Sequence, residues 1–427
     1  DSFNVAVGIS AGKAVTTGEQ NTLIGGQVGD SLTAGNSNVA VGYNSLGNDQ
    51  LGDNAVAIGH EALSTQRFTT TTDNYNVAVG FRAGYVVSTG TANVLIGGLA
   101  GDAITTGTNN TAIGHEALST EDAHGTNVAV GYQTLKTLNA GANGSNVAVG
   151  YQTGLAMTTG IENTLMGALA GDALTNADRN TAFGYSALTV DTLGSKSTAL
   201  GSIALANQNF TTATDSHNTA IGYAAGQEVT TGTENTLVGS LAGDAITTGN
   251  NNVAVGHLAL STNVLSHFNT AIGNDALFAH NQGTAIESFN TAVGFNTAAE
   301  LTTGVRNTLI GAKAGDALTD ADFNTSIGFE SLSGDTLGSY STALGYQALA
   351  SQNFTTATNS HNTAVGMQSL AGLLTGIDNT AVGSGSGQSL TTATKCTLIG
   401  AQAGDAITTG GFNTLIGQNS GSAINTA

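Results

Sequence analysis

The chain has 427 residues, of which 60 are glycine and none is proline or tryptophan, and its formal net charge is −20. Proteins bind nucleic acid and anionic membranes through clusters of lysine and arginine side chains. This acidic chain has only nine basic residues, spread along its length, so binding to either is not expected. No apolar run approaches the roughly 20 residues of a transmembrane helix, and the single cysteine, Cys396, excludes an intramolecular disulfide framework.

A five-residue unit recurs from residues 4–8 to residues 413–417: Asn, two small or β-branched residues, an aliphatic residue and Gly. We call its closing Gly the anchor glycine and name each coil after it. The anchors are 17 residues apart, except for four gaps of 21 and one of 19. A fixed period of this size is typical of solenoids. We therefore predict an all-β, parallel β-solenoid or β-roll of about 24 coils, which forms one continuous repeat array over residues 1–427.

Each coil begins with a short segment of strand character, as in residues 21–25 and 252–256, where β-branched and aliphatic residues alternate with small ones. The residue directly before the anchor is apolar in all 24 coils, so we predict that it is a core position. Runs of helix formers at a spacing of 3.6 residues are absent and Gly recurs every few residues, so we do not expect helices.

The second half of each coil has two forms. In the Gly form, Gly stands four residues after the anchor and an aliphatic residue three further on, as with Gly101 and Ile104; in the Leu form, Leu takes the first of these places, as with Leu118. We interpret the two forms as alternative ways of filling one interior space. Longer gaps divide the coils into blocks that begin at Gly8, Gly80, Gly150, Gly222 and Gly294, spaced by 72, 70, 72 and 72 residues. The sequence thus predicts a superrepeat of four coils.

The longer gaps contain loops, three of which are near copies: residues 67–75, 209–217 and 353–361. With coils stacked at about 4.8 Å, such loops project from one edge of a rod at intervals of roughly 19 Å. We predict that their aromatic and His residues serve in surface binding or at a subunit interface. These residues are Phe68, Tyr75, Phe210, His217, Phe354 and His361.

Asn stands four residues before the anchor in 20 of the 24 coils. Stacked amides can bond to the backbone at a turn and to each other, so we predict a structural Asn ladder inside the solenoid. The alternative is a row of amides that binds a ligand. Representative members of the ladder are Asn21, Asn38, Asn110, Asn163, Asn235, Asn307, Asn379 and Asn413. Cys396 occupies the same position in its coil, which favours a packed thiol over a reactive one.

The residue after the anchor is Tyr, Phe or His in half of the coils. Such a row serves in packing, at a subunit interface or as a platform for sugar rings. Its tyrosines are additional candidates for surface binding or a subunit interface: Tyr132, Tyr151, Tyr185 and Tyr223.

Two further patterns carry weaker predictions. An Asp follows Gly in one coil of each block, as at Asp102 and Asp244, but a separation of roughly 19 Å prevents two such residues from sharing an ion, so we expect a turn or surface role and no metal. Thr pairs such as Thr105 and Thr106 are similar to the hydroxyl arrays of ice-binding solenoids, although the Leu-form coils interrupt them. No catalytic grouping or cofactor motif stands out, so we expect neither enzymatic activity nor a cofactor.

The repeated unit at residues 110–114 and 218–222, with Ala three residues later at Ala117 and Ala225, resembles the head repeat of trimeric autotransporter adhesins. Similar repeats are found in phage tail fibres. The resemblance covers essentially the whole chain and implies a left-handed parallel β-roll, three chains side by side, and adhesion to host surfaces.

Together these patterns predict a structural or adhesive fibre protein, the rod-like shaft or head of an extracellular appendage or a virion fibre. The expected partners are further copies of the chain, as a homotrimer or an end-to-end filament, and a cell-surface glycan or protein. Nucleic acid binding and membrane insertion are not expected. The chain begins at Asp1 and has no signal-peptide pattern, so we expect a processed or excised chain. The alternatives are a filament without adhesive activity and an ice-binding solenoid.

Overall fold

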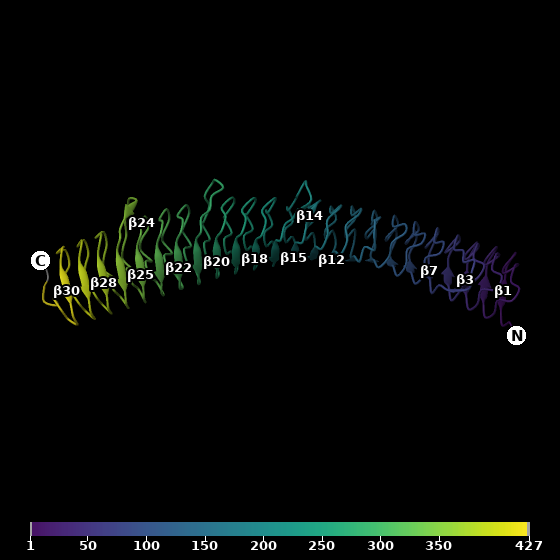
Figure 1. Cartoon of the computed structure of the whole chain (residues 1–427), viewed down its shortest axis with the longest axis horizontal. Coiled ribbons are helices and arrows are strands. Elements are labelled where there is room, and N and C mark those ends of the chain that lie inside the picture. The colour runs from purple at the N-terminus through teal and green to yellow at the C-terminus, as the bar shows by residue number, and fades with distance from the viewer. Residues whose placement is uncertain (1, 425–427) are drawn as a thin grey trace. The chain divides into compact units, whose positions relative to one another are not determined.

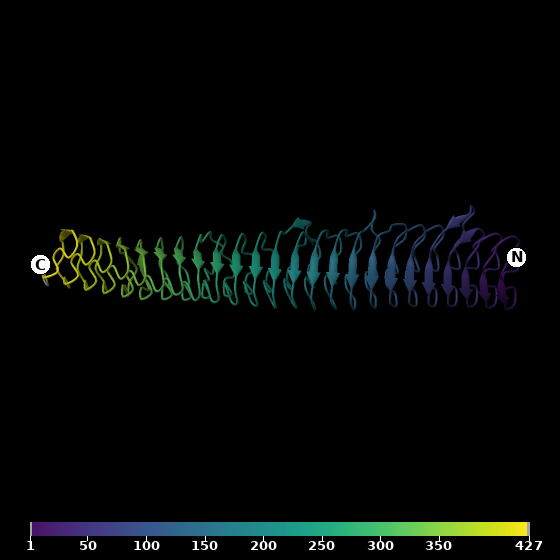
Figure 2. The same ribbon diagram turned by 90° about the horizontal axis from the view of Figure 1, so that it is seen from below.

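The computed structural model describes residues 2–424. In this range it contains 30 β-strands and no helix, and 24 of the strands form one parallel sheet (Figures 1 and 2). Each of these strands has three residues and lies directly before an anchor glycine. The predicted all-β parallel solenoid with one coil per repeat is confirmed.

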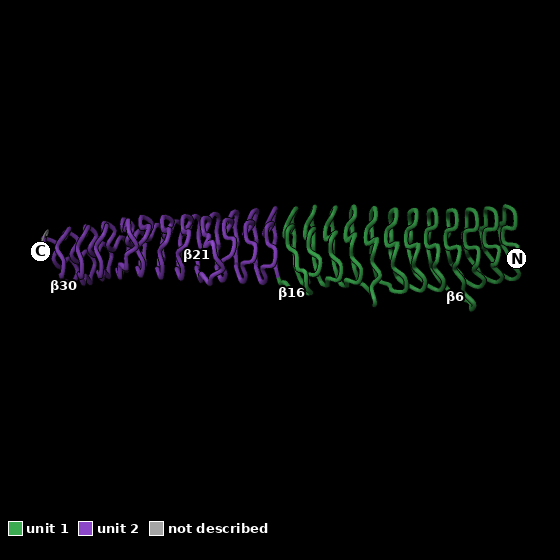
Figure 3. The backbone as a smooth tube through the Cα atoms, turned by 90° about the horizontal axis from the view of Figure 1, so that it is seen from above, with its two compact units in different colours: residues 1–217 green, residues 218–427 purple. Residues whose placement is uncertain are grey.

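The chain divides into two compact units, residues 1–217 and 218–427 (Figure 3). Unit 1 contains twelve strands of the main sheet: β1 (Val5–Val7), β2 (Thr22–Ile24), β3 (Val39–Val41), β5 (Val56–Ile58), β7 (Val77–Val79), β8 (Val94–Ile96), β9 (Thr111–Ile113), β10 (Val128–Val130), β11 (Val147–Val149), β12 (Thr164–Met166), β13 (Thr181–Phe183) and β15 (Thr198–Leu200). Unit 2 contains the other twelve: β17 (Thr219–Ile221), β18 (Thr236–Val238), β19 (Val253–Val255), β20 (Thr270–Ile272), β21 (Thr291–Val293), β22 (Thr308–Ile310), β23 (Thr325–Ile327), β25 (Thr342–Leu344), β27 (Thr363–Val365), β28 (Thr380–Val382), β29 (Thr397–Ile399) and β30 (Thr414–Ile416).

The remaining six strands have two residues each and form three parallel pairs at the near-copy loops. The pairs are β4 (Gly52–Asp53) with β6 (Thr72–Asp73), β14 (Gly194–Ser195) with β16 (Thr214–Asp215), and β24 (Gly338–Ser339) with β26 (Thr358–Asn359). Within residues 2–424 the structure has no helix of the length and hydropathy that crossing a membrane requires.

The register of the main sheet places equivalent residues of neighbouring coils beside each other. In β9 and β10, for example, Ala112 pairs with Ala129 and Ile113 with Val130. The middle residue of each strand points into the coil, where Leu95 and Ala112 are completely buried. Every coil therefore contributes one inward side chain from its strand.

The prediction that the residue before the anchor is a core position is wrong. Side chains alternate between the two faces of a strand, so this residue shares the outer face with the first residue of its strand. Ile96 is 36% exposed and Leu200 is 40% exposed. The core position is one residue earlier, and the constant apolar character before the anchor belongs to the outside of the sheet.

The two coil forms fill the same interior space in different ways. In the Gly97 coil, a Cβ on Gly101 would lie 2.7 Å from Cδ2 of Leu95 and 2.8 Å from Cδ1 of Ile104, so only Gly leaves room for both side chains. In the next coil the strand contributes the smaller Ala112, and Leu118 is completely buried in the space that remains.

The anchor glycines are needed because the coils approach each other closely at this point. Gly114 has φ +136°, and a Cβ there would lie 2.2 Å from the carbonyl oxygen of Gly131 in the next coil. Neither this conformation nor this distance allows a side chain.

Candidate interaction surfaces

The Asn ladder lies inside the coils. The backbone N–H of Asn110 donates to Oδ1 of Asn93 at 3.0 Å, and Nδ2 of Asn93 donates to the carbonyl oxygen of Gly107 at 2.9 Å. The thiol of Cys396 is buried as well, and the backbone N–H of this residue donates to Oδ1 of Asn379 at 3.0 Å. Of the ladder residues singled out above, only Asn413 is partly exposed, and its Nδ2 donates to the carbonyl oxygen of Gly410 at 3.1 Å. The amides hold neighbouring coils together and present no row to a ligand.

The Phe residues of the near-copy loops are not at the surface, so the expectation of a surface role is wrong for Phe68, Phe210 and Phe354. Each is only 5% exposed. A Cβ on Gly52 would lie 2.9 Å from the ring of Phe68, which shows how closely this ring packs on the coil below. The phenyl rings are therefore part of the interior, and the loops close over it.

A buried carboxylate holds each of these loops in place. Oδ1 of Asp49 accepts the backbone N–H groups of Gly52 at 3.2 Å and Phe68 at 3.1 Å, and Oδ2 accepts Nε2 of Gln66 at 2.7 Å. The same arrangement recurs with Asp191 and with Asp335. Burial raises the pKa of Asp191, although its hydrogen bonds to Gln208 and to backbone N–H groups oppose the shift.

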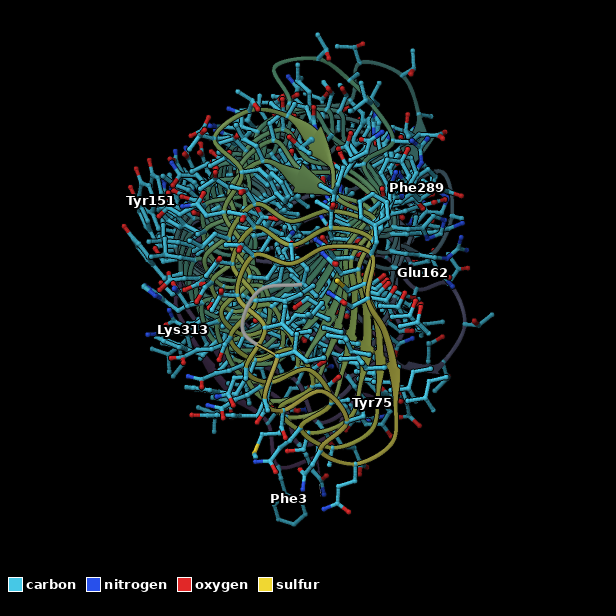
Figure 4. The ribbon with its side chains drawn as sticks, turned by 90° about the vertical axis from the view of Figure 1, so that its left-hand side faces the viewer. Phe3, Tyr75, Tyr151, Glu162, Phe289 and Lys313 are labelled. Carbon is cyan, nitrogen blue, oxygen red and sulfur yellow. The ribbon has the colours of Figure 1, made fainter. Side chains whose placement is uncertain are left out.

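The other predicted residues of these loops, Tyr75, His217 and His361, belong to a row five residues before the anchors. Tyr75 is 59% exposed, and His217 and His361 are exposed too. Figure 4 looks along the coils: in unit 1, Tyr75 and Glu162 of this row lie on the opposite side from Tyr151, which follows an anchor.

Unit 2 stacks aromatic rings along this row, a feature that we did not predict. The ring centroids of Phe268 and Phe289 are 5.1 Å apart, and those of Phe323 and Tyr340 are 4.8 Å apart. The guanidinium of Arg306 lies 5.3 Å from the ring centroid of Phe323. Reading the sequence at five residues before each anchor would have revealed these neighbours.

The row after the anchors also consists of stacked rings. The centroid of Tyr132 lies 5.7 Å from that of His115 and 5.4 Å from that of Tyr151. Tyr185 and Tyr223 are exposed, as are the stacked tyrosines. The stacked rings cover each other's faces and leave their edges to solvent.

The outer face of the main sheet carries an apolar row. Its strands expose the aliphatic residue before the anchor, for example Ile58, Ile310 and Leu344. The other outward position, at the start of each strand, is Val or Thr throughout, and in unit 2 it is Thr in every strand except β19, which starts at Val253. We call this surface the outer sheet face.

Two groups singled out in the sequence, the Thr pairs and the Asp after Gly, are partly shielded by the coil. In the pair Thr158 and Thr159, the hydroxyl of Thr158 donates to the carbonyl oxygen of Thr175 at 3.3 Å, so the scaffold uses the first Thr. Oδ1 of Asp102 is buried without a hydrogen-bond partner, and burial raises the pKa of this carboxyl. Among residues 2–424 no three His, Cys, Asp or Glu side chains are grouped so that they could hold a metal ion.

A polar cavity of about 480 Å³ lies on unit 1, lined by Ser31, Asn48, Gln50, Thr65 and Arg67. A second cavity, on unit 2, is smaller, at about 230 Å³, and includes apolar side chains such as Leu258 and Phe278. We did not predict either cavity, because each combines residues of several coils.

Fold and surfaces together define a β-solenoid repeat protein. No protein-family model matches the chain, and no curated protein sequence matches it at a significant level.

Proposed function

We propose that this chain is a structural and adhesive fibre protein whose copies associate along the outer sheet face, and that it belongs to an extracellular appendage or a virion fibre. The observation that carries the proposal is the continuous apolar stripe on that face. The proposed role is mechanical and adhesive rather than catalytic.

The length of the stripe supports an interface. Twelve coils at about 4.8 Å give the outer sheet face of each unit a length of roughly 58 Å, along which the apolar row of residues before the anchors lies beside a row of Val and Thr. Monomeric proteins rarely expose continuous apolar patches larger than a few hundred Å², and such patches usually mark interaction sites. The chain also carries a net charge of −20, which opposes non-specific association, so a specific interface fits better than indiscriminate aggregation.

The resemblance to adhesin head repeats favours three chains around this face. A trimer would bury the stripe of each chain and leave the loops and the polar cavity of unit 1 facing outwards. The buried stripe would then provide the shaft, and the outward surfaces would provide adhesion.

The test is the mass in solution of the wild type and of a variant with Ile58→Glu and Ile113→Glu. We expect the wild type at three times the chain mass of 42.3 kDa and the variant at the mass of one chain, because carboxylates do not enter an apolar interface unpaired. Thr106→Glu with Thr159→Glu adds the same charge at exposed sites away from the stripe and should leave the trimer intact.

A wild type that light scattering finds at the mass of a single chain would refute the proposal. Masses far above a trimer, with filaments in electron micrographs, would favour end-to-end assembly instead.

Ice binding is a second candidate because of the outward Thr residues of unit 2. Eleven of its twelve main-sheet strands begin with Thr, and these side chains lie in register beside the apolar row. Thermal hysteresis in the wild type that disappears in a variant with Thr291→Tyr and Thr325→Tyr would establish this function, and its absence from the wild type would eliminate it.

A further inference from the structure

The polar cavity of unit 1 departs from the repeat that surrounds it. Its five lining residues come from the three successive coils of Gly25, Gly42 and Gly59, and they line about 480 Å³. This volume is within the usual range of roughly 300–1,000 Å³ for sites that bind small molecules. The lining consists of hydroxyl, amide and guanidinium groups.

The later blocks show what the scaffold itself requires at these positions. At the position of Arg67 the other four blocks all have Asn, and at the position of Ser31 they all have Ala. Gln50 and Asn48 have no counterpart with a side-chain amide in any later block. The equivalents of Arg67 are Asn139, Asn209, Asn281 and Asn353, those of Ser31 are Ala103, Ala173, Ala245 and Ala317, those of Gln50 are Asp122, Thr192, Val264 and Thr336, and those of Asn48 are Thr120, Val190, Thr262 and Gly334. Because those blocks form the same coils, the fold does not need these four polar side chains; only Thr65, whose hydroxyl donates to the carbonyl oxygen of Tyr85 at 2.7 Å, also serves the scaffold.

Arg67 is one of four basic residues that form no salt bridge among residues 2–424. Of the other three, Arg306 and Lys395 lie over aromatic rings and Lys313 is in unit 2. The side chain of Arg67 is exposed. By contrast, the ammonium of Lys13 is 2.8 Å from Asp30, and the guanidinium of Arg82 is 2.7 Å from Glu61. An arginine left without a carboxylate in a chain of 29 acidic residues has its fork of N–H donors available for a ligand.

The acidic residues that adjoin lining residues in the chain, Asp30 and Asp49, are already engaged. Ser31 donates weakly to Oδ1 of Asp30 at 3.4 Å, while Oδ2 of Asp30 is paired with Lys13. Asp49, between Asn48 and Gln50 in the chain, is buried and accepts hydrogen bonds from two backbone N–H groups and from Gln66. No lining residue is acidic, so the charge presented inside the cavity is positive.

We propose that this cavity binds a carboxylated sugar, with Arg67 holding the carboxylate and the hydroxyl and amide groups holding the sugar hydroxyls. Arginine binds a carboxylate through two parallel hydrogen bonds, which a neutral sugar cannot form. The polar lining suits a ligand that carries hydroxyl groups on all sides. The inference rests on the proposed adhesive function, for which it names the chemistry of the receptor.

The test is a calorimetric titration with three probes: glucuronate, the neutral sugar glucose, and acetate. We expect glucuronate to bind at least tenfold more tightly than either of the others, because only glucuronate has both the carboxylate and the hydroxyls. An acidic peptide, triglutamate, tests the other source of carboxylates. Glucose binding as tightly as glucuronate, triglutamate binding more tightly, or no heat of binding from glucuronate would each overturn the proposal.

The decisive variants are Arg67→Asn and Ser31→Ala, because both introduce residues that the other blocks already carry at these positions. Loss of the charged hydrogen bonds in Arg67→Asn should weaken glucuronate binding by at least roughly tenfold, and Ser31→Ala should weaken it less. Lys313→Asn removes the same charge from unit 2 and should not change binding. Equal affinity of Arg67→Asn and the wild type would refute the inference.

Light scattering on the same samples separates this inference from the proposed function. Arg67→Asn should keep the mass of the wild type, because residue 67 is not part of the outer sheet face. A wild type that binds glucuronate but has the mass of one chain would refute the proposed assembly and support the cavity. A trimer that does not bind glucuronate would support the proposed assembly and refute the proposed binding site in the cavity.

Discussion

Replacing Asn235 with Ala tests how much the Asn ladder stabilises the solenoid. Oδ1 of Asn235 accepts the backbone N–H of Asn252 at 3.0 Å, and Nδ2 of Asn235 donates to the carbonyl oxygen of Gly249 at 2.8 Å. Both interactions are buried and both link neighbouring coils. Asn235→Ala leaves one buried donor and one buried acceptor without these partners.

The expected cost follows from those two groups. Leaving a buried polar group unsatisfied costs about 1–3 kcal/mol, so Asn235→Ala should lower the free energy of unfolding of unit 2 by about 2–6 kcal/mol. Equilibrium denaturation followed by circular dichroism measures this loss. Hydrogen exchange should also show faster exchange of the Asn252 amide, because the coils separate there first.

Thr231→Ala is the matched control. Thr231 is an exposed residue of the preceding coil, and its replacement should change stability by no more than about 0.5 kcal/mol. If Asn235→Ala lowers the free energy of unfolding no more than Thr231→Ala does, the Asn ladder does not stabilise the solenoid, and the prediction is refuted.

Three further predictions concern the backbone, the loops and pH. Gly114→Ala should prevent normal folding in circular dichroism, because its Cβ would meet a carbonyl oxygen at 2.2 Å, whereas Gly141→Ala, with no atom within 4 Å, should fold. Phe210→Ala should lower the free energy of unfolding by about 3–5 kcal/mol, as for a ring in the core. A loss below about 1 kcal/mol would contradict the assignment of this ring to the core. Because burial raises the pKa of Asp191, the folded carboxyl keeps its proton to a higher pH than the unfolded one, and stability falls as pH rises from about 4 through the folded pKa. The melting temperature of the wild type minus that of Asp191→Asn should therefore decrease as pH rises over this range, and a constant difference would contradict the shift.

The period of the sequence was sufficient to predict the fold, because a 17-residue repeat of Asn, strand and Gly has few other structures. The direction of single side chains was harder to predict. The residue before the anchor is always apolar, yet it faces outwards, while the inward position is Leu in the second coil of each block, Ser at Ser326 and Ala in the other coils of the five blocks. A constant apolar position does not by itself show which of the two faces of a strand it occupies.

The loop aromatics and the cavity show two further limits. The sequence predicts that Phe68 is a surface residue, because it precedes a run of Thr residues in one of the longer gaps between anchors. Only the packing of its ring over Gly52 shows that it is buried. Arg67 reads as an ordinary loop residue, because its neighbours in the cavity, such as Ser31, are 36 positions away in the chain. Such sites depend on which coils lie side by side, and they become visible once the coils are aligned with each other.

The coils that lack a ladder Asn show how to separate scaffold from function. Where Ala55 interrupts the ladder, Oδ1 of the loop residue Asn74 accepts the backbone N–H of Asn76 at 2.9 Å, and Oε1 of Gln66 accepts Nδ2 of Asn76 at 2.9 Å. The loop therefore repairs the ladder, and its extra residues and its buried Gln are explained by the fold. Arg67, in the same loop, replaces no hydrogen bond of the ladder, and every other block has Asn at its position. A departure from the repeat that the scaffold does not use is the best place to look for a ligand.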